Sequence, residues 1–135
     1  MAGDRTRRLH EAGVPIIAGT DAGIFTNIPS SSLIRDLELL VAAGLSPHEA
    51  ISAATVTAGP ALGLIDRGQI APDFRANLTL VRGDPLTNVT LEHPSAVMVG
   101  GVWLDSEALS RLRDASRDSS ITRTTRRLLA ELLFR

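Results

Sequence analysis

The sequence contains no cysteine and no lysine, and it has few aromatic residues. Without cysteine the chain can form no disulfide, no thiolate nucleophile and no cysteine-based zinc site. Without lysine it offers neither a Schiff-base amine nor a P-loop lysine. Aromatic residues are 3% of the chain, too few for the stacking platforms that bind single-stranded nucleic acid.

The chain also lacks an excess of either charge. Its 14 basic residues, all arginine, stand against 15 acidic residues, so the net charge is −1. This balance predicts no nucleic-acid partner and no anionic membrane surface as a partner. A basic tail that binds nucleic acid is a weaker alternative, because the arginines near the carboxyl end are offset by Asp114, Asp118 and Glu131.

Long apolar stretches are missing as well. The longest runs, residues 14–18 and 39–43, fall far short of the ~20 residues that a membrane span needs. The charged start has no apolar segment of the kind found in signal peptides. We therefore expect a cytoplasmic protein with no membrane contact.

The patterning that is present predicts an α/β protein. A helix ends at Gly13, and the apolar residues 14–18 predict a strand buried on both faces, as in parallel sheets. Apolar residues from Leu33 to Val41 have helical spacing. Ser46-Pro47-His48-Glu49 is typical of a capping box that starts a short helix.

Strand patterns follow in the second half. Residues 76–82 alternate weakly, and the apolar residues 96–99 and 102–104 flank Gly100-Gly101, which predicts a two-residue hairpin with a type I′ turn. From residue 106 the chain is charged with helical leucine spacing. We expect three parts, at residues 1–64, 65–105 and 106–135.

Several motifs, taken together and in order, resemble the amidohydrolase superfamily, most closely its imidazolonepropionase-like and prolidase-like branch. The matching stretches are residues 14–23 (VPIIAGTDAG), 36–50 (DLELLVAAGLSPHEA), 53–55 (AAT), 61–64 (ALGL), 68–78 (GQIAPDFRANL) and 83–86 (GDPL). The family's Pro-Gly-X-X-Ala-Asp-Leu appears here with Asp73 in place of Gly and Asn77 in place of Asp.

The resemblance implies the carboxyl-terminal portion of a (β/α)₈ TIM barrel, with its last strand and helices, part of a small β-sandwich domain and a helical tail. A complete barrel takes about 250 residues, so we expect this chain to be a fragment that lacks the family's other metal ligands. The function implied is metal-dependent hydrolysis of carbon–nitrogen bonds in amides or cyclic amides of small molecules. We expect the chain to be inactive alone, its partner being a complementing barrel half or a second copy.

Asp21 is the residue on which this function depends. It follows the predicted strand, where barrel enzymes keep their catalytic groups. In the family this aspartate binds the metal, most often zinc, and takes the proton of the bound water. Thr20, Ala22 and Gly23 would line the substrate mouth by the same resemblance. From spacing alone, Asp21 also fits an Asx turn and the loop fits a plain capping loop.

The other polar residues fit structural or surface roles better than roles in catalysis or metal binding. His10, His48 and His93 show no metal-ligand spacing, so we expect them on the surface and expect no zinc to be bound by this chain alone. Arg35 and Arg75 could bind a substrate carboxylate but are expected to be solvated. Asp36 is expected in the first turn of the next helix, where its charge favours the helix dipole. The alternative function is a non-catalytic barrel remnant that serves as an association module.

Overall fold

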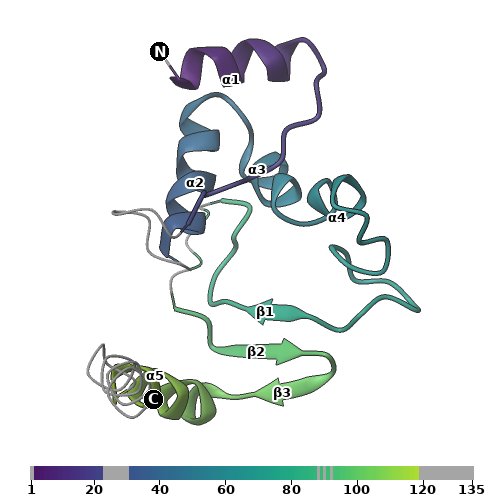
Figure 1. The fold of residues 1–135 in the computed structure, drawn as a ribbon. Coiled ribbons are helices and arrows are strands. Elements are labelled where there is room, and N and C mark those ends of the chain that lie inside the picture. The colour runs from purple at the N-terminus through teal and green to yellow at the C-terminus, as the bar shows by residue number, and fades with distance from the viewer. Residues whose placement is uncertain (1, 23–30, 88, 90, 92, 119–135) are drawn as a thin grey trace, which may run out of the picture.

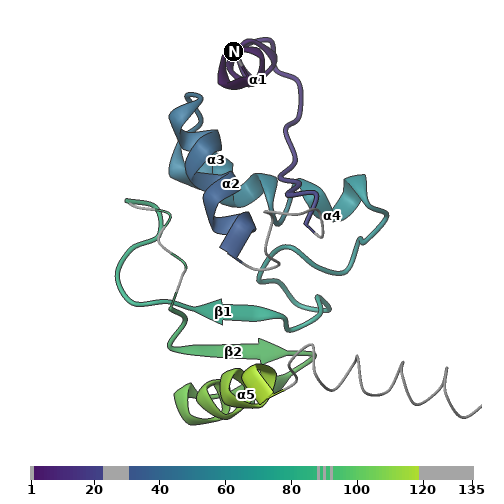
Figure 2. The ribbon, with the colours of Figure 1, turned by 60° about the vertical axis from the view of Figure 1, so that its left-hand side comes forward.

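The computed structural model describes residues 2–22, 31–87, 89, 91 and 93–118. Figure 1 shows helices α1 to α4 at one end of the molecule and a three-stranded sheet at the other, with α5 beside it. Figure 2 shows the same order, with β1 nearest the helices. The elements are α1 (Ala2–Glu11), α2 (Ser31–Ala42), α3 (Pro47–Ala53), α4 (Ala58–Ala61), β1 (Leu78–Leu80), β2 (Ala96–Val99), β3 (Val102–Leu104) and α5 (Ser106–Asp118).

The hydrophobic core lies where α2 packs on α3. The helical spacing predicted from residue 33 is confirmed, because Leu37 and Leu40 on one face of α2 are buried at 1% and 8% exposure. They form a cluster with Leu45 and with small residues of α3, and Val89 from the β1–β2 connection joins it. The core therefore links the helical end of the chain to the sheet.

The capping box at the start of α3 is confirmed. The Glu49 amide donates to Ser46 Oγ at 3.2 Å, and the Ser46 amide donates to Glu49 Oε2 at 2.7 Å. Pro47 occupies the first turn, where its missing N–H costs nothing. The turn after α2 is thereby fixed in position before α3 begins.

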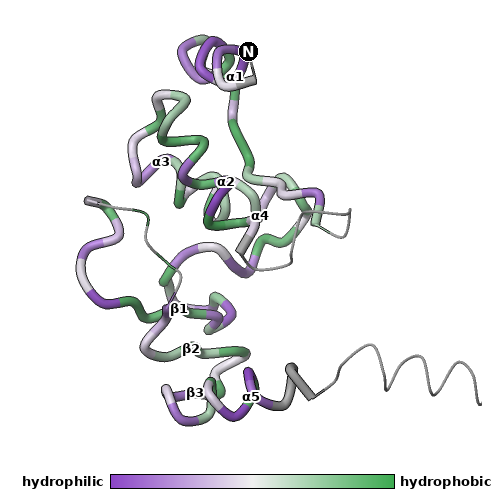
Figure 3. Tube along the Cα trace, turned by 90° about the vertical axis from the view of Figure 1, so that its left-hand side faces the viewer, coloured by the Kyte–Doolittle hydropathy of each residue, from purple (hydrophilic) through white to green (hydrophobic). Residues whose placement is uncertain are grey.

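The strand predicted for residues 14–18 is wrong for this structure. These residues belong to no helix or strand, and Val14 and Ile17 are 43% and 44% exposed. Ile16 and Ala18 pack against the core cluster, so one side of the run is covered. The hydrophobic run between α1 and α2 is visible in Figure 3. A strand exists only through ladder bonds to a neighbour, and no described strand lies beside this run.

The predicted hairpin is confirmed. β2 pairs antiparallel with β3, Val99 facing Val102, and β1 pairs antiparallel with the other edge of β2. Gly100 and Gly101 have φ of +56° and +85°, the left-handed values that a type I′ turn requires. The predicted strand at residues 76–82 is shorter, Leu78–Leu80.

The two departures from the family's turn motif have visible roles. Asp73 has φ +66°, a left-handed conformation that glycine adopts without steric strain. Asn77 Oδ1 accepts a hydrogen bond from the Gly100 amide at 2.7 Å, which an aspartate could also accept. The substitution at position 77 therefore preserves the contact, whereas the one at position 73 adds backbone strain.

The chain after the sheet continues as α5, as predicted. Asp105 Oδ1 accepts from the Ala108 amide at 2.8 Å and caps the helix, which packs on β2 and β3. The rest of the predicted tail, residues 119–135, lies outside the described residues. No helix in the described part of the chain has the length and apolar character needed to cross a membrane.

Candidate active site

The candidate site is the end of the apolar run, residues 18–21, which two helices hold in place. The Ala18 amide donates to the carbonyl oxygen of Ala53 at the end of α3, at 2.9 Å. The next amide, that of Gly19, donates to Asp36 Oδ2 on α2 at 3.0 Å. Hydrogen bonds from two successive amides thus tie the run to both core helices just before Asp21.

Asp21 projects at the end of this anchored segment. It is exposed, with φ of +50°, a left-handed conformation that aspartate adopts more readily than most residues. Within the described ranges its carboxylate makes no hydrogen bond and no ion pair. The Asx turn considered from the sequence would use the amide of residue 23, outside the described residues, so that interpretation stays a prediction.

The predicted mouth residues are only partly described. Thr20 is half-buried and Ala22 is exposed, while Gly23 lies outside the described residues. These positions flank Asp21 in the chain. Whether they line a substrate mouth stays a prediction.

The described residues do not assemble a metal site. Among them, no group of three or more histidine, aspartate and glutamate side chains converges. His48 and His93 are exposed. His10 Nε2 lies 3.6 Å from Glu49 Oε1, an ion pair if the imidazole is protonated. A catalytic zinc site needs about three protein ligands, and the described residues alone do not bring that many together. A metal-binding role for Asp21 therefore stays a prediction.

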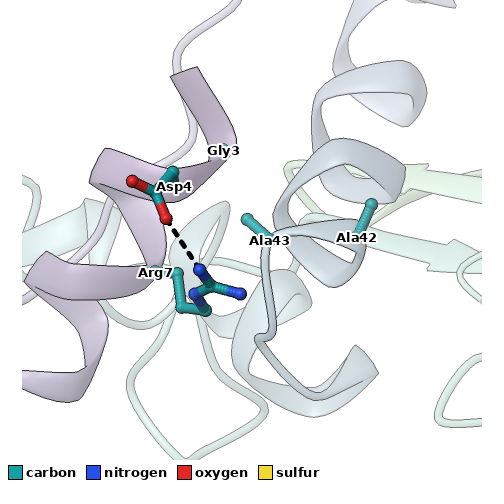
Figure 4. A pocket seen from close by; sticks show the side chains of 5 residues that line it. All are labelled: Gly3, Asp4, Arg7, Ala42 and Ala43. Carbon is teal, nitrogen blue, oxygen red and sulfur yellow. Dashed lines mark hydrogen bonds and ion pairs between the residues drawn. The ribbon is translucent and has the colours of Figure 1, made fainter. Parts of the chain in front are cut away.

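Among the described residues, two hollows lie beside α1. One of about 240 Å³ is lined by Gly3, Asp4, Arg7, Ala42 and Ala43, with Arg7 Nη2 2.7 Å from Asp4 Oδ1 (Figure 4). The other, of about 440 Å³, is lined mainly by residues 13–16 and by His10, Leu45 and Glu49. Neither hollow is lined by Asp21.

Asp36 is a functional candidate that does not lie where the sequence pattern predicts it. It is not in the first turn of α2, which starts at Ser31 and has no acidic residue there. Its side chain is half-buried beside Leu37 and reaches Gly19, 17 residues earlier in the chain. A helix-dipole role is therefore wrong. The signal available in the sequence was an acid next to a core position of the helix.

The two arginines considered as substrate anchors each have a partner within the chain. Arg35 pairs with Glu38 at 2.8 Å and Arg75 with Asp66 at 3.3 Å. Hydrogen bonding from Arg67, then the charges of Arg67 and Arg75, lowers the pKa of Asp66. Both arginines considered as substrate anchors thus already bind carboxylates of the chain.

The hydroxyl and amide of Ser46 hydrogen-bond to Glu49 and lower the pKa of its carboxyl. The nearby imidazoles of His10 and His48 lower it further when protonated. Glu49 therefore carries its charge in its role as a helix cap.

Several known proteins are similar to this chain in sequence. Imidazolonepropionase of Deinococcus deserti is 45% identical over 76 residues, which cover 53% of this chain and 18% of that protein. Imidazolonepropionase of Streptomyces griseus subsp. griseus is 34% identical over 103 residues, 72% of this chain and 25% of that protein.

Two solved structures are similar as well. A Xaa-Pro dipeptidase with methionine bound in its active site has a TM-score of 0.69 at 28% identity, covering 77% of this chain and 25% of that one. An amidohydrolase has a TM-score of 0.64 at 28% identity, covering 76% and 25%. The chain thus spans about a fifth to a quarter of the length of these relatives. The model of the Amidohydrolase family matches residues 4–104, well over half of the sequence, and the chain therefore belongs to the amidohydrolase family.

Proposed function

We propose that this chain is the carboxyl-terminal barrel part of a metal-dependent hydrolase that cleaves carbon–nitrogen bonds of amides or cyclic amides in small molecules. The observation that supports this most is the placement of Asp21, an exposed carboxylate at the end of a segment held by α2 and α3. The relatives named imidazolonepropionase and Xaa-Pro dipeptidase support a substrate in which a carbon–nitrogen bond is cleaved.

Asp21 would accept the proton of the attacking water. A divalent metal, zinc by the family resemblance, would when bound lower the pKa of that water. The Asp21 carboxylate has one oxygen to contribute as a ligand and one to receive the proton. Thr20, Ala22 and Gly23 would contact the substrate beside it.

The chain alone would supply only part of this site. It covers 18% to 25% of the matched relatives, and its described residues converge on no metal. The remaining ligands would come from a complementing barrel half. We therefore propose that the isolated chain is inactive and holds no stoichiometric zinc.

The test is the Asp21→Asn substitution in an enzyme reconstituted with the missing barrel part of a close relative. The amide keeps the side-chain shape but cannot accept the proton, so turnover should fall by more than the 10²–10⁴-fold typical of a lost general base. Glu38→Gln is the matched control, since this exposed residue of α2 pairs with Arg35. Full turnover by Asp21→Asn would show that the site is placed wrongly.

A second candidate is an association module without catalysis. Large apolar side chains are exposed in the sheet half of the chain, among them Ile65 at 80%, Ile70 at 88%, Val102 at 63% and Trp103 at 52%. Such surface favours association with a second copy. A monomer by light scattering, together with activity upon reconstitution, would exclude this function.

A further inference from the structure

The hydrogen bond between Gly19 and Asp36 suggests a second residue that acts at the site. It joins a backbone amide two residues before Asp21 to a carboxylate on α2, at 3.0 Å. Asp36 is half-buried, and the next residue, Leu37, is 1% exposed in the core. The acceptor therefore sits on a part of α2 that core packing holds still.

Gly19 is the position where such an anchor matters most. Glycine has the widest backbone freedom of any residue, and this one directly precedes Thr20 and Asp21. Its conformation does not require glycine, because its φ lies outside the left-handed range and an added Cβ would meet nothing within 4 Å. Without a partner for its amide, the backbone at Gly19 could rotate freely and change the position of Asp21.

We propose that Asp36 is a positioning residue: its carboxylate holds the Gly19 amide and so fixes the direction in which Asp21 presents its own carboxylate. This inference rests on the proposed function, in which Asp21 is catalytic. A charged acceptor makes a stronger hydrogen bond to an amide than a neutral one does. Asp36 would thus act through the backbone and would touch neither substrate nor metal.

The first experiment uses the full 135-residue chain and needs no activity. Amide hydrogen exchange is measured by NMR for the wild type, Asp36→Ala, Asp36→Asn and the control Glu38→Ala. Exchange at Gly19 should quicken by about tenfold or more in Asp36→Ala, the effect of losing one hydrogen bond. It should change little in Asp36→Asn, which keeps an acceptor oxygen, and in Glu38→Ala. Unchanged Gly19 exchange in a folded Asp36→Ala would overturn the proposal.

If circular dichroism shows that Asp36→Ala has lost its helix content, a second measurement tests the contact between Gly19 and Asp36. Asp36→Asn preserves the side-chain shape while it replaces a charged acceptor by a neutral one. The Gly19 amide proton should then move upfield, with the other amides of α2 nearly unchanged. A Gly19 resonance that does not move would overturn the contact.

The functional experiment uses the reconstituted enzyme. Asp36→Ala should lower kcat by about tenfold or more with little change in KM, because substrate binding is kept while Asp21 is poorly aimed. Asp36→Asn should restore most of kcat. Gly19→Ala restricts the backbone at residue 19 without a steric clash. It should therefore partly restore kcat when it is combined with Asp36→Ala. An Asp36→Ala variant with wild-type kcat would overturn positioning.

The two proposals fail in different ways. Full activity of Asp21→Asn would refute the proposed function whatever Asp36 does. An inactive Asp21→Asn combined with an unaffected Asp36→Ala would leave the proposed function standing and remove Asp36 alone.

Discussion

Replacing Leu37 by alanine should destabilise the chain strongly, and the structure provides a matched control on the same helix. Leu37 is 1% exposed in the core, whereas Leu39, two residues along α2, is 51% exposed. Removing a fully buried leucine side chain costs about 2–5 kcal/mol, from lost burial and from the cavity left behind. The exposed leucine should cost less than about 1 kcal/mol, because half of its side chain already meets water.

The loss caused by Leu37→Ala should be large compared with the total free energy of unfolding. Small domains unfold with about 5–15 kcal/mol, and the buried cluster of this chain is small: Leu37, Leu40, Leu45, Ala50, Ala53 and Val89. A chain with so small a core should lie near the lower end of this range, where a loss of about 2 kcal/mol is already a third or more of the free energy of unfolding. Since Asp36 is the adjacent residue, the loss should also speed amide exchange at Gly19.

The assay is urea unfolding followed by circular dichroism for the helices and by the fluorescence of Trp103 for the sheet. Leu37→Ala should shift both midpoints, because Val89 ties the β1–β2 connection into the same core. Equal losses for Leu37→Ala and Leu39→Ala would refute the assignment of the core face of α2. A shift seen by circular dichroism alone would refute the coupling between the two halves.

Further predictions concern acid stability, the strained turn and metal content. In the folded chain the pKa of Glu49 is lowered by Ser46, so its stabilising charge is present at neutral pH and is lost as pH falls through the folded pKa; thermal melts of wild type and Glu49→Gln should differ at neutral pH and converge in acid. Asp73→Gly should stabilise by roughly 0.5 kcal/mol, because relief of the φ +66° conformation outweighs the added freedom of the unfolded chain; a lowered midpoint in urea would contradict this. Elemental analysis of the dialysed chain should find no stoichiometric zinc, and one tightly held zinc per chain would reopen the roles of the histidines.

The features predicted correctly from sequence are those encoded by neighbouring residues. The box of Ser46 and Glu49 depends on a spacing of three residues, and the hairpin depends on Gly100-Gly101 between apolar runs. The core face of α2 follows from helical periodicity. In each case local geometry decides the structure, and the local sequence carries the signal.

The features that were missed depend on distant partners. Residues 14–18 have the composition of a buried strand, but a strand needs a neighbour to pair with, and the described chain provides none there. The bond from Gly19 to Asp36 spans 17 residues and exists only once α2 lies against the run. No sequence pattern within either segment predicts this hydrogen bond.

The bond from the Gly100 amide to Asn77 bears on how faithfully the sheet aligns. Together with the 3.0 Å bond from the Gly101 amide to the Ala76 carbonyl, it ties the hairpin tip to the residues just before β1, where Leu78 faces Met98. Sliding β1 by one position would break both ties and turn its side chains to the opposite face. A three-residue strand has too few ladder bonds to enforce its own alignment. Here the two hydrogen bonds, one to the Asn77 side chain and one to the Ala76 carbonyl, set the register of a strand that is too short to set it alone.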